Sequence, residues 1–106
     1  MSLQGRILNI KFLNSVSHKL EDFKPLIDDQ VGIYSCGPTV YDFAHLGNLR
    51  AYVFADTLVR ILRLAGFKVK WVMNITDIDD KTLAGAKAAG IPLKEFTGKY
   101  EKEFWF

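Results

Sequence analysis

The chain lacks most of the features that would place it in a specialised class of protein. Among its 106 residues there are one cysteine and three prolines. A single cysteine cannot form an internal disulfide, which excludes a disulfide-stabilised secreted module. No apolar run approaches the ~18 residues of a membrane-spanning helix. The chain also has no large excess of positive or negative residues, because its formal net charge is only +2. The broad basic surface typical of non-specific nucleic-acid binding is therefore not indicated.

What is present is typical of a globular protein. Hydrophobic residues make up 49% of the chain, which is too many for a disordered tail. The first five residues show no clear signal peptide, so we expect a cytoplasmic, reducing environment. The last three, Phe104-Trp105-Phe106, are strongly apolar, whereas chain ends are usually polar. We therefore expect a fragment of a longer protein, cut within an element.

The pattern of apolar residues predicts an α/β fold. Val31–Cys36 is a strand that we expect to be buried on both faces, and a helix begins near Gly47 or Asn48 and ends near Ala65. With a strand at 69–74 these elements form a βαβ unit, the first half of a Rossmann-like parallel sheet. The other expected elements are a strand at 7–13, a short returning strand at 18–23, a helix at 78–89 and a helix from Leu93 to the end.

The predicted helices carry two further expectations. The long helix should bury the apolar set Ala51, Phe54, Ala55, Leu58, Ile61, Leu62 and Ala65, while Arg50, Arg60 and Arg63 lie on a solvated face. The next helix should be capped at Thr76-Asp77, with Asp79 and Asp80 in its first turn. This acidic cluster could also bind magnesium or calcium, but we favour the cap.

Polar residues gather where ligands bind in such folds. Ligands of an open α/β sheet lie outside the carboxyl ends of the strands. Residues 36–39 and 74–77 follow the two central strands, and a loop brings 45–48 to the start of the helix between them. The unpaired N–H groups of a helix N-terminus bind phosphate readily. The pattern favours a nucleotide or phosphate site, although the chain contains neither GxxxxGK[ST] nor GxGxxG.

Three segments then carry a family resemblance. They are YSCGPTVYD at 34–42, HLGN at 45–48 and MNITDIDDK at 73–81. In this order and spacing they closely resemble the N-terminal part of cysteinyl-tRNA synthetases, which are class I aminoacyl-tRNA synthetases. The similarity runs from about Leu8 to Lys81. It implies a Rossmann-type catalytic domain that activates cysteine with ATP and transfers it to tRNA(Cys).

The resemblance implies roles for the helix-start motif. The family's His-Ile-Gly-His signature corresponds to His45, Leu46, Gly47 and Asn48, which would bind ATP, with His45 and Asn48 as catalytic residues. The fourth position is a departure, since the family has histidine there. Asparagine still donates a hydrogen bond and is favoured at helix starts. We therefore expect the contacts to ATP to differ in detail, without loss of ATP binding. The implied cofactors are ATP with magnesium, and zinc.

The resemblance also implies a cysteine-binding side. Cys36 matches a zinc ligand of the family, and that zinc binds the substrate thiolate and so separates cysteine from serine. A metal-bound thiol is deprotonated near neutral pH, whereas a hydroxyl is a poorer ligand. Gly37, Thr39 and Thr76 match substrate-binding positions.

Several parts of the family pattern lie downstream of residue 106: the remaining zinc ligands, the KMSKS-like loop and the tRNA-binding domains. We therefore interpret residues 1–106 as the N-terminal part of the catalytic domain. The fragment alone is expected to be inactive, to bind zinc poorly and to self-associate through exposed apolar surface. Two alternatives stay open: a cysteine:amino-sugar ligase of thiol biosynthesis, and a stand-alone, non-catalytic nucleotide-binding module.

Overall fold

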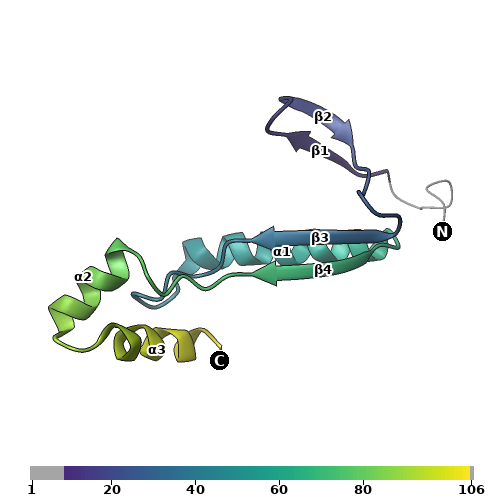
Figure 1. Ribbon diagram of the computed structural model, residues 1–106. Helices are drawn as coiled ribbons and strands as arrows, with labels where there is room; N and C mark the ends of the chain where they lie inside the picture. Colours follow the sequence, from purple (N-terminus) through teal and green to yellow (C-terminus); the bar gives the residue numbers. More distant parts are fainter. Residues whose placement is uncertain (1–8, 106) are drawn as a thin grey trace. The chain divides into compact units, whose positions relative to one another are not determined.

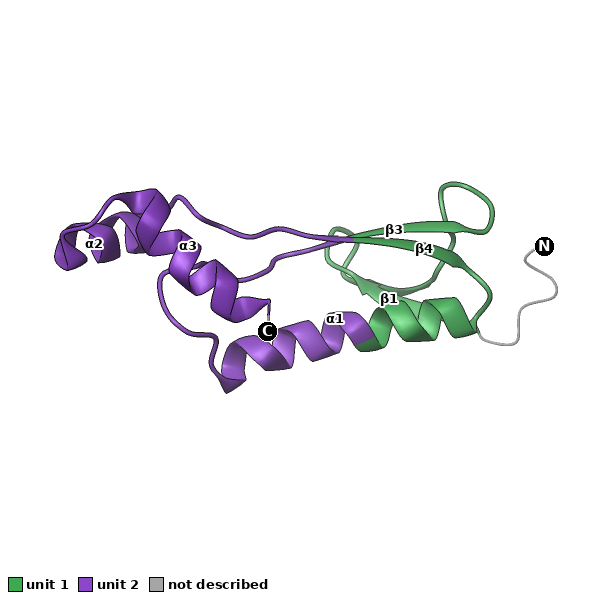
Figure 2. Ribbon diagram, turned by 90° about the horizontal axis from the view of Figure 1, so that it is seen from below, with its two compact units in different colours: residues 1–33, 57–71 green, residues 34–56, 72–106 purple. Residues whose placement is uncertain are grey.

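The computed structural model describes residues 9–105, which form two compact units. Of these residues, one unit comprises 9–33 and 57–71, and the other 34–56 and 72–105 (Figure 2). In chain order the elements are β1 (Lys11–Asn14), β2 (Lys19–Asp22), β3 (Gln30–Ser35), α1 (Leu46–Leu64), β4 (Lys68–Met73), α2 (Asp80–Ala89) and α3 (Leu93–Phe104) (Figure 1). Strands β3 and β4 and helix α1 each pass from one unit into the other.

Strands β3 and β4 form a two-stranded parallel sheet, and α1 is the crossover that connects them. The expected α/β class and βαβ unit are therefore confirmed. The expectation that the strand at 31–36 is buried on both faces is wrong. Along β3 only Val31 is buried, and exposed and half-buried residues otherwise alternate. A strand covered on one side alternates in this way, because successive side chains point to opposite faces.

In the first unit, β1 and β2 form an antiparallel hairpin with Lys11 opposite Asp22 and Asn14 opposite Lys19. Asn14 fixes the turn, since its Oδ1 accepts from Val16 N–H at 2.9 Å and its carbonyl accepts from His18 N–H at 2.7 Å. The predicted strands at 7–13 and 18–23 are thus confirmed within the described residues. Residues 7 and 8 of the first strand lie outside them.

An apolar core holds the first unit together. Val31, Leu62, Ala65 and Phe67 are buried, and ten apolar residues in all pack into this cluster. Phe23 links hairpin and core, because its ring makes edge contacts with Phe12 at 5.3 Å and with Phe67 at 5.4 Å between centroids. Full burial of a large apolar side chain such as Leu62 or Phe67 stabilises a fold by about 1.5–3 kcal/mol.

Helix α1 buries a different stripe from the predicted one. Ala55, Leu62 and Ala65 are buried as expected and Leu58 is half-buried, but Val59 is also buried, at 1% exposure. Three residues that were expected to be buried are exposed: Ala51, Phe54 and Ile61. The reason is that α1 is apolar around most of its circumference, so periodicity alone could not select the buried side. We call the exposed apolar set the outer face of α1: Leu46, Leu49, Val53, Phe54, Ile61 and Leu64.

In the second unit, α2 begins at Asp80, two residues later than predicted. Its N-cap is Asp79, not Thr76-Asp77: Asp79 Oδ1 accepts from Thr82 N–H at 2.8 Å, and Thr82 Oγ1 accepts from Asp79 N–H at 2.8 Å. This reciprocal capping box satisfies two otherwise unpaired donors. Helix α2 ends at Gly90 in the left-handed conformation, as predicted, and packs on α3 with Phe96 buried. No helix of residues 9–105 is long and apolar enough to cross a membrane.

Candidate functional site

Two segments that follow the strands continue to pair beyond the ends of β3 and β4. Thr39 and Thr76 form a parallel bridge. Thr76 N–H donates to the Pro38 carbonyl at 2.9 Å, and Val40 N–H donates to the Thr76 carbonyl at 3.0 Å. The predicted clusters at 36–39 and 74–77 are therefore adjacent. The same pairing explains why Thr76 does not cap α2, since its backbone is held in an extended ladder.

Gly37 lies against the backbone of Asn74. Its N–H donates to Asn74 Oδ1 at 2.7 Å. A Cβ atom at Gly37 would lie 1.9 Å from the Asn74 carbonyl oxygen and 2.8 Å from Met73 Cγ, which no side chain tolerates. Only glycine allows this close approach, so the pairing of the two segments depends on residue 37.

His45 and Asn48 build the start of α1 together. Gly47 N–H donates to His45 Nδ1 at 3.1 Å, and His45 N–H donates to Asn48 Oδ1 at 3.1 Å. We call this reciprocal pair the capping box of α1, although the His45 ring accepts from Gly47, two residues on, where a standard capping box uses the N–H three residues on. Because Nδ1 accepts a hydrogen bond, the imidazole carries its proton on Nε2, which is a donor available to a ligand. Asn48 likewise keeps its Nδ2 donors.

A hollow of about 290 Å³ brings part of the predicted site together. Of the predicted residues it is lined by Gly37, Thr39, His45 and Asn48. The other four do not line it: Cys36, Leu46, Gly47 and Thr76. Gly47 and Thr76 nevertheless contact lining residues, because Gly47 bonds to the His45 ring and Thr76 pairs with Thr39. Leu46 points away, at 82% exposure.

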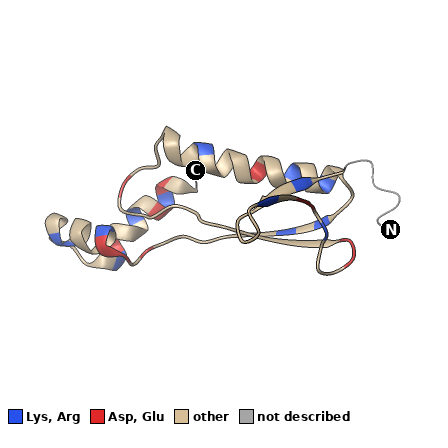
Figure 3. Ribbon diagram, turned by 90° about the horizontal axis from the view of Figure 1, so that it is seen from above, with Lys and Arg blue, Asp and Glu red and all other residues tan. Residues whose placement is uncertain are grey.

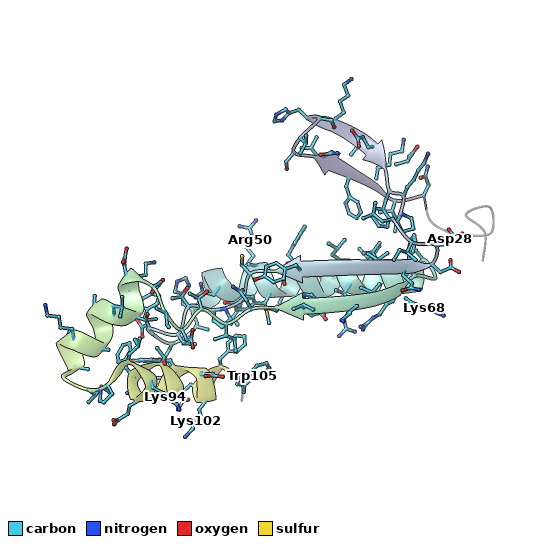
Figure 4. The ribbon with its side chains drawn as sticks, in the orientation of Figure 1. Asp28, Arg50, Lys68, Lys94, Lys102 and Trp105 are labelled. Atoms are coloured by element: carbon cyan, nitrogen blue, oxygen red, sulfur yellow. The ribbon has the colours of Figure 1, made fainter. Side chains whose placement is uncertain are left out.

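Sequence reasoning missed the residues that α3 adds to this hollow. Tyr100, Glu103 and Phe104 line it, and edge contacts hold α3 in place: Tyr100 packs on Phe43 at 5.2 Å and Phe104 packs on Tyr52 at 5.6 Å. No local signal in the sequence marks these residues as site residues. The apolar end of the chain was the one available hint, since Phe104 is half-buried even though Trp105 beside it is exposed (Figure 4).

The lining carries charges of both signs. Asp42 and Glu103 are acidic, and Lys81 is basic, with its ammonium 5.0 Å from the centre of the Tyr41 ring. Burial raises the pKa of the Tyr52 hydroxyl above its ordinary 10.0, so this group remains a neutral donor near neutral pH. Lysine, arginine and acidic residues are also interspersed on the rest of the chain (Figure 3). The hollow is therefore lined by charged, polar and aromatic side chains together.

The first unit has a larger hollow of about 730 Å³, lined by the segment 23–27 and the facing residues of β3 and β4. Its polar groups are lysines and a glutamine at the rim, and Leu26 beside them is fully exposed. Asp28 and Lys68 lie at this end of the strands (Figure 4), where Lys68 N–H donates to the Asp29 carbonyl. None of the sequence motifs lies here, so the smaller hollow is the better candidate site.

Comparison with known proteins settles the family. The model of the tRNA synthetases class I (C) catalytic domain matches residues 22–105. The chain belongs to this family. Among similar proteins, cysteine–tRNA ligase of Methanosarcina mazei is 54% identical over 96 residues, which is 91% of this chain and 20% of the relative. That of Brachyspira hyodysenteriae is 50% identical over 97 residues, or 92% and 20%. That of Chlamydia pneumoniae is 50% identical over 101 residues, or 95% and 21%.

The predicted resemblance is thus confirmed over most of the chain. The chain spans about a fifth of the length of these curated relatives. Family membership therefore fixes what kind of catalytic domain this is, whereas the roles of single residues depend on the geometry described above.

The zinc expected for a synthetase of this family needs about four ligands. Cys36 offers one exposed thiol beside Gly37. Across residues 9–105 no three His, Cys, Asp or Glu side chains are grouped so as to hold a metal ion. The described residues therefore do not form a complete zinc site.

Proposed function

We propose that this chain forms the ATP- and cysteine-binding part of a cysteine–tRNA ligase. In the proposed reaction a cysteine carboxylate oxygen attacks the α-phosphorus of ATP, and pyrophosphate leaves. A ribose hydroxyl at the 3′ end of tRNA(Cys) then attacks the carbonyl carbon of the adenylate, and AMP leaves. The chain supplies binding and orientation for the first of these steps.

One observation carries the proposal. The Gly37–Thr39 segment, held on Asn74 and Thr76, lines the same hollow as the His45–Asn48 capping box. Residues of the first two family segments, 34–42 and 45–48, thus line one hollow, and the third segment, 73–81, belongs to the same compact unit. Activation requires the carboxylate of one substrate and the α-phosphate of the other to lie within reach of each other. Adjacent motif residues in one hollow meet that requirement.

The helix start is the proposed ATP side. His45 and Asn48 line the hollow, and His45 Nε2–H and the Asn48 Nδ2 group are their proposed donors to phosphate. The N–H groups of Gly47, Asn48 and Leu49 already donate to His45, so the helix start contributes its partial positive charge rather than free donors. Gly47 leaves room for the His45 ring, because a Cβ at residue 47 would lie 2.9 Å from His45 Cε1 and displace the ring. Leu46 contributes through its backbone, because its side chain is exposed to solvent. Donors fixed in advance stabilise phosphate charge without reorganisation.

The segment 36–39 is the proposed cysteine side. Thr39 lines the hollow and Thr76 pairs beside it, so their hydroxyls are candidate partners for the amino acid. Cys36 is proposed to supply one ligand of a zinc site that other parts of a complete ligase finish. ATP with magnesium, L-cysteine and tRNA(Cys) are the proposed partners, and the cytoplasm is the proposed location.

Cysteine-dependent exchange of pyrophosphate into ATP tests the proposal, measured on the complete polypeptide that carries this segment. We expect exchange with cysteine and not with serine. His45→Ala should reduce kcat by about 100-fold or more, in line with the loss of a group that stabilises developing charge. His18→Ala is the matched control, because His18 is in the β1–β2 turn of the other unit and should leave exchange unchanged.

The acceptor separates the alternatives. Transfer of cysteine to tRNA supports the ligase, and transfer to an amino sugar instead would assign the chain to the related thiol-biosynthesis enzymes. ATP binding without any cysteine-dependent exchange would favour the non-catalytic module. Exchange that is unaffected by His45→Ala would refute the assignment of the ATP side.

A further inference from the structure

We propose that Asn74 is a positioning residue that sets the geometry of the cysteine side of the site. Its side chain joins the two segments that carry the proposed substrate-binding residues. This inference rests on the proposed function, because it matters to catalysis only if Cys36, Gly37 and Thr76 face the amino acid. Asn74 itself does not line the hollow.

Asn74 uses both ends of its amide. Oδ1 accepts from Gly37 N–H at 2.7 Å, across 37 positions of sequence. Nδ2 points to Thr76 Oγ1 at 3.5 Å, the limit of a hydrogen bond. Its backbone contributes as well, since Asn74 N–H donates to the Ser35 carbonyl at 3.4 Å. One residue therefore contacts Ser35, Gly37 and Thr76.

The bond to Gly37 fixes the peptide group that follows Cys36. The Cys36 carbonyl and the Gly37 N–H belong to one planar unit, so holding the N–H also holds the direction in which the chain leaves Cys36. Cys36 lies between two contacts to Asn74, one at Ser35 and one at Gly37. The residues before and after Cys36 are thus both hydrogen-bonded to Asn74, which restricts the position of the thiol.

The chemistry of asparagine fits this task better than that of its close analogues. Alanine would leave Gly37 N–H, in a half-buried position, without its partner. Aspartate would keep an acceptor for Gly37 but would lack the N–H donor to Thr76 and bring a charge into a half-buried site. Asn74→Ala and Asn74→Asp therefore separate the loss of the Gly37 bond from the loss of the amide donor.

The first readout is hydrogen exchange of the Gly37 amide in the 106-residue chain, followed by NMR. Asn74→Ala should accelerate exchange at Gly37 by about five- to tenfold, the equivalent of one hydrogen bond. Asn74→Asp should keep Gly37 protected. Asn14→Ala is the matched control: it removes a side-chain acceptor of a backbone N–H, in the β1–β2 hairpin, and should leave Gly37 unchanged.

The second readout is pyrophosphate exchange in the complete polypeptide. Asn74→Ala should raise KM for cysteine by about five- to tenfold while KM for ATP changes less than about twofold, because the ATP side does not depend on this contact. Asn74→Asp should restore part of the affinity for cysteine. A merely structural role would instead lower stability and affect both substrates alike.

The outcomes separate this inference from the proposed function. If the unchanged polypeptide exchanges pyrophosphate with cysteine but Asn74→Ala leaves KM for cysteine unaltered, the positioning role is wrong and the proposed function stands. Equal changes for cysteine and ATP would also overturn the positioning role. If the unchanged polypeptide shows no cysteine-dependent exchange, the proposed function fails and the inference fails with it.

Discussion

Replacement of Gly37 by alanine would place a methyl group against the backbone of Asn74. The added Cβ would lie 1.9 Å from the Asn74 carbonyl oxygen, 2.8 Å from Met73 Cγ and 3.1 Å from the Asn74 carbonyl carbon. Two of these three atoms belong to the backbone of the adjoining segment, which cannot move away as a flexible side chain could. The segments 36–40 and 74–76 would have to separate.

The size of the effect follows from these contacts. Forcing a methyl group into a closely packed position costs about 1–3 kcal/mol. Loss of the Gly37–Asn74 hydrogen bond adds about 1 kcal/mol. Alanine also restricts the unfolded chain, which returns about 0.4–1 kcal/mol. We therefore expect Gly37→Ala to lower the free energy of unfolding by about 1–3.5 kcal/mol.

Urea unfolding of the 106-residue chain, followed by tryptophan fluorescence, measures this difference. Gly98→Ala is the matched control, because Gly98 lies within α3 and a Cβ there meets no atom within 4 Å. Alanine should raise stability at that position by up to about 1 kcal/mol through helix propensity. If Gly37→Ala is as stable as the unchanged chain, the two segments are not in close contact and the described site is wrong.

Three further outcomes are expected. Asp79→Ala removes the acceptor of Thr82 N–H at the start of α2 and should cost about 1 kcal/mol in the same urea assay; no loss would contradict the cap. Hydrogen bonds from Ser17 and Asn14 lower the pKa of Glu21 below 4.5, so the carboxylate stabilises the hairpin above about pH 4.5, and this is lost as pH falls through the lowered value. An acid titration by NMR should show the hairpin loosening below that pH, and unchanged hairpin shifts would refute the linkage. The outer face of α1 should cause self-association, so sedimentation velocity should show dimers that weaken when its apolar residues become polar; a monomer at all concentrations would contradict this.

The sequence predicted those parts of the fold that depend on local signals. The start of α1 was predicted near Gly47 or Asn48, and the helix begins at Leu46. The helices predicted to end near residues 65 and 89 are each followed by a glycine with a positive φ angle, 91° at Gly66 and 68° at Gly90. Such terminal signals involve neighbouring residues and so can be recognised without tertiary structure.

The features that the sequence did not predict depend on contacts between distant residues. The cap of α2 is Asp79 because Thr76 is occupied by pairing with Pro38 and Val40, which the sequence does not reveal. The buried stripe of α1 was misassigned at Ala51, Phe54 and Ile61 because several faces of the helix are apolar. The contribution of Tyr100 to the hollow depends on the packing of α3 and has no local signature.

The most direct test of the account is an NMR titration of the 106-residue chain with a non-hydrolysable ATP analogue. If the start of α1 binds ATP, the amides of Gly47 and Asn48 and the His45 ring should shift together, with smaller shifts at Gly37 and Thr39. Loss of these shifts in His45→Ala would assign the ATP side to the capping box. Shifts confined to the hollow of the first unit, or no shifts at the start of α1, would contradict the central claim.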